Sequence, residues 1–131
     1  MKKFEISLAT SETNFYNITT QVQEVISQSN VNDGIAIIFC PHTTAGITIN
    51  ENADPEAIRD IILGLKEVYP NRPEFKHGGG NSDAHLKAST IGSSVTVIIE
   101  NGRILLGMWQ AIYFCEFDPP RNRKYYVVIF D

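Results

Sequence analysis

The sequence Gly34-Ile35-Ala36-Ile37-Ile38-Phe39-Cys40 decides the fold class of this chain. The run is short and apolar throughout, and it is bounded by a glycine and by Pro41. Strands that are apolar on both sides lie inside a sheet that is covered on each face. We therefore predict a central, fully covered strand at residues 34–40.

Periodic apolar patterns predict the elements on either side of this run. Alternating apolar and polar residues indicate strands, and apolar residues at i, i+4 and i+7 indicate helices. Asp54 and Pro55 mark a helix start, and Asn101-Gly102 marks a hairpin. These patterns predict strands at residues 3–8, 46–50, 95–100, 104–117 (with a bend at Gly107) and 124–130, helices at 17–29, 55–69 and 83–91, a turn at 11–14 and an irregular loop at 70–80.

This order of elements predicts the α+β class. We expect one compact domain over residues 1–131, with one main antiparallel or mixed sheet and about three helices. A chain of 131 residues buries about two-thirds of its unfolded surface and needs no disulfide. Cys40 and Cys115 lie in apolar runs, so we predict buried, reduced thiols.

Composition argues against two classes of partner. The net charge of −4 argues against a general nucleic-acid-binding surface, and the one basic cluster, Arg121, Arg123 and Lys124, is small. No apolar run approaches the roughly 20 residues that span a bilayer. Met1-Lys2-Lys3 is not followed by the apolar segment of a signal peptide. We expect a cytoplasmic protein that binds neither nucleic acid nor membrane.

All three histidines lie in two polar segments, residues 40–46 and 76–85. Imidazole titrates near neutral pH and is the commonest metal ligand. If the fold brings the segments together, His42, His77 and His85 would form an open metal site with three protein ligands. The alternative is that His42 packs in a turn with its nitrogens on backbone groups.

The second segment also has the character of an anion site. The run Gly78-Gly79-Gly80 leads into a helix start, where free N–H groups and the helix dipole favour anions, and Lys87 adds positive charge. A plain loop and a capped helix is the alternative. Asp83 and His85 share a face on extended backbone but diverge by about 200° in a helix, where Asp83 would instead orient another histidine.

Two further features allow two interpretations each. Trp109, the single tryptophan, is expected in the core more often than as a substrate platform. Glu116 and Asp118 would share a strand face near Arg121 and Arg123. They form either exposed salt bridges that add little stability or a phosphate clamp, which suits the fork of arginine.

Three segments resemble the YjbQ-like family, and the resemblance covers essentially the whole chain. It implies a compact α+β fold, a homotrimer and activity as a secondary thiamine-phosphate synthase. Such an enzyme joins a hydroxymethylpyrimidine diphosphate to a thiazole phosphate and releases pyrophosphate. The segments are His42-Thr43-Thr44-Ala45-Gly46-Ile47-Thr48-Ile49-Asn50-Glu51-Asn52-Ala53-Asp54-Pro55, Asn81-Ser82-Asp83-Ala84-His85-Leu86-Lys87-Ala88-Ser89 and Gly102-Arg103-Ile104-Leu105-Leu106-Gly107-Met108-Trp109-Gln110.

The resemblance also implies roles for site residues. His42, His77 and His85 match the family's motif histidines, which implies a metal or phosphate site. A divalent ion of the zinc or magnesium class would neutralise the leaving diphosphate. His42, Asp83 and His85 are the expected catalytic residues that move protons. The expected phosphate-binding residues are Thr43, Thr44, Asn81, Ser82, Lys87 and Arg121.

The same residues would serve two other functions. One is a metal-dependent phosphate-ester hydrolase, with metal-bound water as the nucleophile. The other is a trimer that binds a metal or metabolite without turnover. The resemblance also implies that the site lies at a subunit boundary, and the apolar strand predicted at residues 104–117 would be an exposed edge unless a partner covers it.

Overall fold

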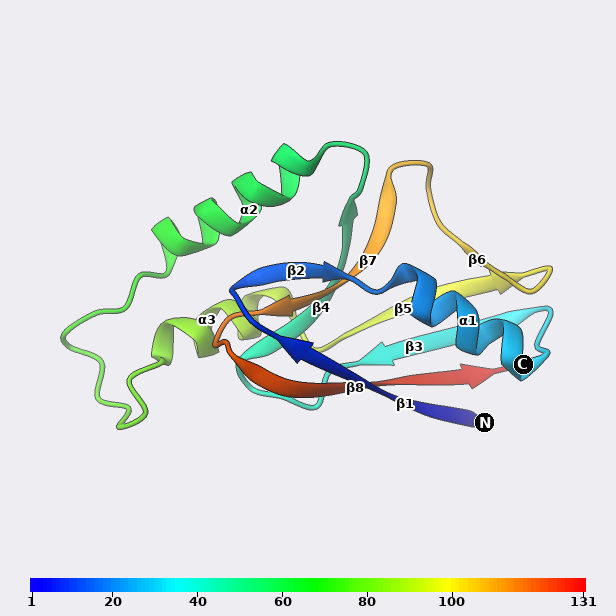
Figure 1. Cartoon of the computed structure of the whole chain (residues 1–131), viewed down its shortest axis with the longest axis horizontal. Coiled ribbons are helices and arrows are strands. Elements are labelled where there is room, and N and C mark those ends of the chain that lie inside the picture. The colour runs from blue at the N-terminus through cyan, green and yellow to red at the C-terminus, as the bar shows by residue number, and fades with distance from the viewer.

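Eight strands and three helices make up the protein, which is described over residues 1–131 by a computed structural model (Figure 1). The strands belong to two antiparallel sheets of five and three strands. In chain order the elements are β1 (Lys2–Thr10), β2 (Asn14–Asn17), α1 (Thr19–Ser29), β3 (Gly34–Phe39), β4 (Ala45–Glu51), α2 (Pro55–Val68), α3 (Ser82–Ile91), β5 (Ser94–Glu100), β6 (Arg103–Leu105), β7 (Gln110–Glu116) and β8 (Arg121–Phe130).

The larger sheet has β3 at its centre, in the order β1-β8-β3-β5-β6. Its inner face carries Ala36 and Ile38, which pack with Val22 and Ile26 of α1 in an apolar core of 16 buried residues. All four side chains are completely buried. The helix α1 therefore covers one face of this sheet, as its apolar spacing requires.

The smaller sheet, in the order β2-β7-β4, supports the other two helices. Ala84 and Ala88 of α3 pack with Phe15 and Cys115 in a second apolar cluster. The helix α2 lies at the periphery in Figure 1, and none of its residues is buried. Its apolar side chains contact the second cluster only as partly buried residues, so α2 forms a loosely packed wall.

Several sequence predictions are confirmed, including the α+β class with three helices. Asp54 caps α2 by accepting a hydrogen bond from the amide of Glu56 at 3.0 Å. Asn101 and Gly102 both have positive φ and close the hairpin between β5 and β6. Cys40 and Cys115 are buried free thiols. None of the three helices is long and apolar enough to cross a membrane.

The prediction of one long strand at residues 104–117 is wrong. The segment divides into β6 of the larger sheet and β7 of the smaller one. Gly107 and Gln110 close the turn between them: the Gly107 amide donates to the Gln110 side chain at 2.8 Å, and the Gln110 amide donates to the Gly107 carbonyl at 3.0 Å. The protein therefore has two sheets in place of one main sheet, and β7 lies in the middle of its sheet, between β4 and the unpredicted β2.

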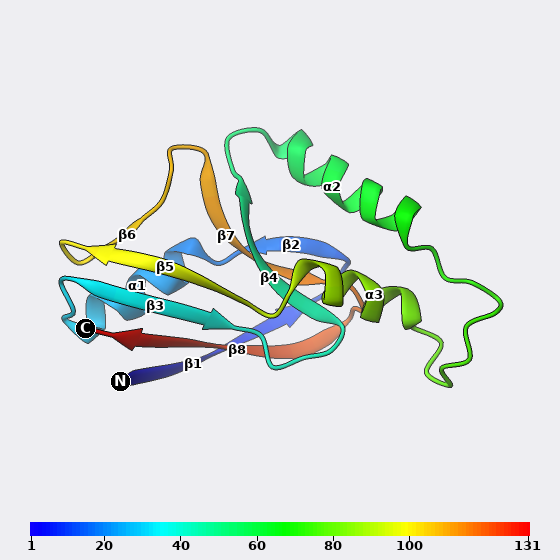
Figure 2. The same cartoon turned by 180° about the vertical axis from the view of Figure 1, so that it is seen from behind.

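The prediction that both faces of β3 are covered is also wrong. Ile35 and Phe39, on the face opposite α1, are 40% and 41% exposed. Figure 2 shows this side, and no helix covers it, because α2 and α3 pack on the smaller sheet. Trp109 is 59% exposed in the loop before β7 and is not a core residue.

Candidate functional site

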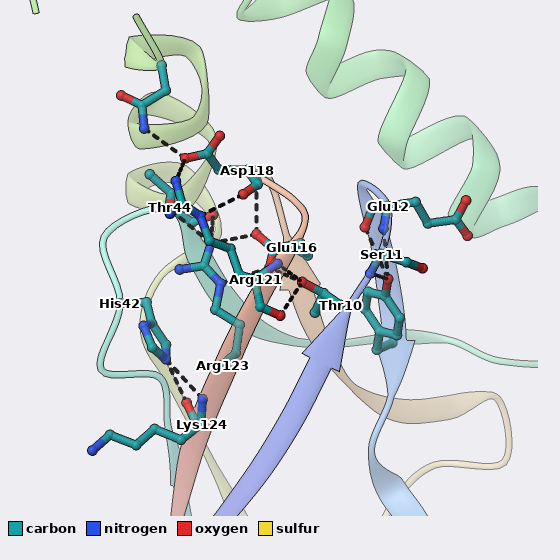
Figure 3. Close-up of polar contacts among 12 residues, drawn as sticks. Thr10, Ser11, Glu12, His42, Thr44, Glu116, Asp118, Arg121, Arg123 and Lys124 are labelled. Carbon is teal, nitrogen blue, oxygen red and sulfur yellow. Dashed lines mark hydrogen bonds and ion pairs between the residues drawn. The ribbon is translucent and has the colours of Figure 1, made fainter. Parts of the chain in front are cut away.

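The two histidine-bearing segments meet at a polar pocket of about 350 Å³. Three parts of the chain build it: the loop between β3 and β4, the start of α3, and the β7–β8 connection with the first residues of β8 (Figure 3). We call it the histidine pocket. Its lining is polar apart from one proline and consists of Pro41, His42, Thr43, Thr44, Asn81, His85, Asp118, Arg121 and Arg123.

A buried ion pair forms the floor of the histidine pocket. Arg123 contacts both carboxylate oxygens of Glu116, at 2.7 Å through Nε and 2.5 Å through Nη2. The same Nη2 donates to Thr44 Oγ1 at 2.9 Å. Burial raises the pKa of Glu116, but hydrogen bonds from Arg123, Thr10 and the Asp118 amide outweigh that effect and hold the pKa below its usual value. The ionised pair thus fixes the loop of Thr44 against β7 and β8.

A second carboxylate joins the start of α3 to the β7–β8 connection. Asp118 Oδ2 accepts hydrogen bonds from Arg121 Nη2 at 2.7 Å and from Asn81 Nδ2 at 2.8 Å. These two donors outweigh the effect of burial and lower the pKa of Asp118. The other amide atom of Asn81, Oδ1, is buried and has no hydrogen-bond partner within the protein. An unpaired buried acceptor favours a ligand that carries a donor.

One of the two ring nitrogens of His42 contacts the backbone of Lys124. Its Nε2 lies 3.0 Å from the carbonyl oxygen and 3.1 Å from the amide nitrogen of Lys124. Burial, and then the positive charge of Arg123, lower the pKa of His42 below 6.5. The turn-packed alternative therefore holds for Nε2, whereas Nδ1 makes no hydrogen bond within the protein. His42 is neutral at pH 7 and retains one free nitrogen.

The other two histidines contact each other. The rings of His77 and His85 have centroids 5.1 Å apart and are nearly perpendicular, at 82°. His85 lines the histidine pocket and His77 does not. No three His, Cys, Asp or Glu side chains are grouped to hold a metal ion. Within one chain the three imidazoles are therefore not grouped around one point, and their binding of a divalent ion stays a prediction.

Comparisons with known proteins agree with the fold and the motifs. The model of the family described as "UPF0047 protein YjbQ-like" matches residues 3–131. The chain belongs to the YjbQ/UPF0047 family. The protein YugU of Bacillus subtilis is 53% identical over 112 residues, which are 85% of each chain. MJ1081 of Methanocaldococcus jannaschii is 56% identical over 113 residues, 86% of this chain and 82% of that one.

Solved structures of family members have the same architecture. An uncharacterised YjbQ/UPF0047 protein of Clostridium acetobutylicum superposes with a TM-score of 0.94 at 55% identity, over 97% of this chain and 99% of that one. The conserved hypothetical protein TT1486 of Thermus thermophilus gives a TM-score of 0.91 at 38% identity, over 97% and 99% of the two chains. This YjbQ-like fold is therefore shared by distant members.

Two predicted site residues of this YjbQ-like chain face another cavity. α3 begins at Ser82, so Asp83 and His85 are both helical and point apart, as the helical alternative requires. Asp83 and Lys87, one turn apart, line a separate cavity toward α2. Ser82 starts the helix and does not line the histidine pocket. Of the predicted residues, His42, Thr43, Thr44, Asn81, His85 and Arg121 do line it.

The sequence did not indicate that Glu116 and Arg123 at the floor are buried, and it did not indicate that Thr10 belongs to the site. Glu116 and Arg123 were considered as part of an exposed cluster or a clamp, but they are 0% and 8% exposed. Their positions in the apolar strands β7 and β8 are the signal that indicates burial. Thr10 donates to Glu116 at 2.6 Å from 106 residues away, and no local pattern identifies such a contact.

Proposed function

We propose that this chain is a secondary thiamine-phosphate synthase-type enzyme that handles phosphorylated substrates in the histidine pocket. The observation that carries the proposal is the lining of that pocket. It combines arginine, neutral imidazole, threonine and amide groups with the N-terminal turn of α3 and contains no apolar side chain apart from one proline. Such a set of donors suits phosphate oxygens better than it suits an apolar ligand.

The phosphate-binding groups are those with unused donors. Arg121 gives Nε to the Asp118 carbonyl and Nη2 to its carboxylate, which leaves Nη1 free at a half-exposed position. At the start of α3 the amides of Ala84 and His85 donate to the Asn81 carbonyl, so only the amides of Ser82 and Asp83 lack a partner within the helix. The hydroxyl of Thr43 makes no hydrogen bond within the protein, whereas that of Thr44 is occupied by Arg123. Arg121 and Thr43 therefore bind the diphosphate, and the dipole at the α3 N-terminus adds positive potential.

In the proposed reaction the thiazole nitrogen attacks the methylene carbon of the pyrimidine diphosphate. A C–N bond forms, the C–O bond breaks, and the electron pair leaves with pyrophosphate. The thiazole nitrogen carries no proton, so the pocket needs to stabilise the leaving anion rather than to supply a base. Arg121 and the α3 N-terminus supply that charge, and His85 donates a hydrogen bond or a proton to the leaving oxygen.

No step of this proposal uses a metal held by the protein. Magnesium is commonly bound through substrate phosphates and only one or two carboxylates, so a diphosphate would bring most of its ligands. Metal-dependent hydrolysis needs a water held on a protein-bound ion. The histidines of one chain do not provide that ligand set. We propose synthase chemistry ahead of the hydrolase because the cationic, donor-rich lining suits a leaving diphosphate.

We further propose that the chain forms the homotrimer implied by its family resemblance, through the uncovered face of the larger sheet. Ile35, Ile98 and Phe130 lie side by side on adjacent strands of that face and are 40%, 52% and 38% exposed. A contiguous apolar surface of this kind favours association. Sedimentation velocity at micromolar concentration tests it: a trimer is expected, an Ile98→Glu variant should dissociate, and a stable wild-type monomer would exclude the idea.

The activity test is product analysis with both phosphorylated substrates. The wild type should produce thiamine phosphate and pyrophosphate, detected by mass spectrometry. His85→Gln should lose this product, whereas Lys76→Ala, at an exposed position outside the pocket, should keep it. Inorganic phosphate without the coupled product would identify a hydrolase. Binding with no product would identify a non-catalytic protein and overturn the proposal.

A further inference from the structure

The second cavity of the molecule lies between α2 and α3 and has a volume of about 580 Å³. We call it the Lys87 cavity. Ile62 and Leu65 of α2 form one apolar wall, and Phe117 contributes another apolar surface. The polar groups of its lining are Thr13, Lys66, Asn71, Asp83 and Lys87. Cavities of this size, mostly apolar with a few polar groups, are typical of small-molecule sites.

Lys87 is the one buried lysine of the chain, at 9% exposure. Its ammonium makes no hydrogen bond within the protein, and the nearest carboxylate oxygen, Asp83 Oδ2, lies 3.6 Å away. An ammonium has three donors, and at most one of them can be directed at that oxygen. The ammonium keeps some solvent exposure at the cavity, so its free donors favour an anionic ligand there.

We propose that the Lys87 cavity binds a small organic carboxylate with an apolar body. The carboxylate would accept hydrogen bonds from Lys87, and the body would contact Ile62, Leu65 and Phe117. The lining carries two lysines, Lys66 and Lys87, and one carboxylate, Asp83, so its net formal charge of +1 matches a single negative charge on the ligand. A monoanion is therefore favoured over the dianion of a phosphate monoester.

The proposed carboxylate site goes beyond the histidine pocket. Lys87 and Asp83 line the α2 side of α3, and His85 lines the other side. Since no residue of α2 is buried, a ligand that fills the cavity would bury apolar surface of this helix. Binding at Lys87 should therefore stabilise the protein against unfolding without occupying the histidine pocket.

The test uses 3-phenylpropionate as the probe, with its uncharged amide and phenyl phosphate as comparisons. Isothermal titration calorimetry and amide NMR shifts of the full chain give affinity and location. We expect the carboxylate to bind more tightly than either comparison compound, with shifts at Leu65, Lys87 and Phe117. Lys87→Met should weaken binding by at least about tenfold, equivalent to roughly 1.4 kcal/mol. The exposed-site control Lys76→Met should leave it unchanged.

Two further variants keep the test decisive. Lys87→Met combined with Asp83→Asn removes both charges, so loss of binding cannot be ascribed to an unpaired Asp83. His85→Gln should abolish the proposed synthase activity but retain probe binding, which separates the two proposals. Equal binding by the amide or by Lys87→Met, tighter binding of phenyl phosphate, shifts confined to the histidine pocket, or no binding at millimolar probe would each overturn the inference.

Discussion

The two sides of α3 hold charge in opposite ways. On the histidine-pocket side, each carboxylate is hydrogen-bonded to an arginine, Glu116 to Arg123 and Asp118 to Arg121. On the other side, Lys87 faces a cavity of mixed polar and apolar lining, with one carboxylate at 3.6 Å and no hydrogen bond. The arginine–carboxylate pairs hold the segments around the histidine pocket in place, and we call these four residues the polar frame. In contrast, Lys87 keeps N–H donors that a ligand can use. Within residues 81–89, Asp83 and Lys87 therefore line the Lys87 cavity, and His85 lines the histidine pocket.

The largest expected effect comes from breaking the frame at Glu116. Glu116→Ala leaves the buried Arg123 without its partner, which should lower the free energy of unfolding by about 3–5 kcal/mol. Urea unfolding measures the change. Glu56→Ala is the matched control, because it removes a carboxylate from an exposed arginine pair and should cost at most about 1 kcal/mol. Equal losses in the two variants would show that the buried pair does not hold the frame.

The second largest effect is expected at His85, where a substitution should lower enzymatic turnover but not stability. His85→Ala should reduce synthase turnover by about 10²-fold or more, since a positioned proton donor typically contributes 10²–10⁴-fold. The melting temperature should change little, because His85 is only partly buried and makes no side-chain hydrogen bond within the protein. Metal content is measured on the same samples. Unchanged metal content and unchanged turnover would remove His85 from the site, whatever the melting curve shows.

Local sequence signals predicted the parts of the fold that depend on neighbouring residues. Asp54 and Pro55 fix the start of α2, and Asn101-Gly102 fixes a hairpin, because caps and tight turns are determined within a few residues. The division of residues 104–117 between two sheets depends on pairing with β4 and β5 far along the chain. Alternation within the segment carries no information on those partners.

The site was predictable in its residue types and less so in its geometry. The confinement of the histidines to two segments predicted that His42, His77 and His85 would share one site; His42 and His85 line one pocket, and His77 does not. Whether Asp83 joins His85 depended on the first residue of α3, and sequence patterns place helix ends only to within about 2–4 residues. That uncertainty is enough to move Asp83 and Lys87 from one cavity to the other.

A pH titration sharpens the contrast by isolating His42. Its pKa is lower in the folded protein than the ordinary value of 6.5, so the unfolded chain binds the proton more readily. The stabilising contribution of neutral His42 is therefore complete above about pH 6.5 and is lost as the pH falls toward the folded-state pKa. His42→Gln should remove this part of the pH dependence. Glu116, whose pKa is also lowered, acts only below about pH 4.5.

NMR titration of the imidazole proton signals locates the effect directly. The His42 signal should titrate with a midpoint below 6.5 in the folded protein. Urea unfolding at pH 7 and at pH 5 should show a decrease in stability for the wild type that is smaller in His42→Gln. A midpoint at or above 6.5 would contradict the burial and charge environment described for this residue.

The smallest effect tests whether the wall of the Lys87 cavity can be stiffened without altering its lining. Gly64 lies in the middle of α2, and a Cβ added there would meet no atom within 4 Å. Alanine in a helix interior is favoured over glycine by roughly 0.5–1 kcal/mol, so Gly64→Ala should stabilise the protein by about that amount. Affinity for 3-phenylpropionate should stay within about twofold, since Gly64 does not line the cavity. Urea unfolding and calorimetry measure the two quantities. A loss of stability would show that α2 is not an independent, loosely packed helix, and a large change in affinity would show that its backbone must bend to admit the ligand.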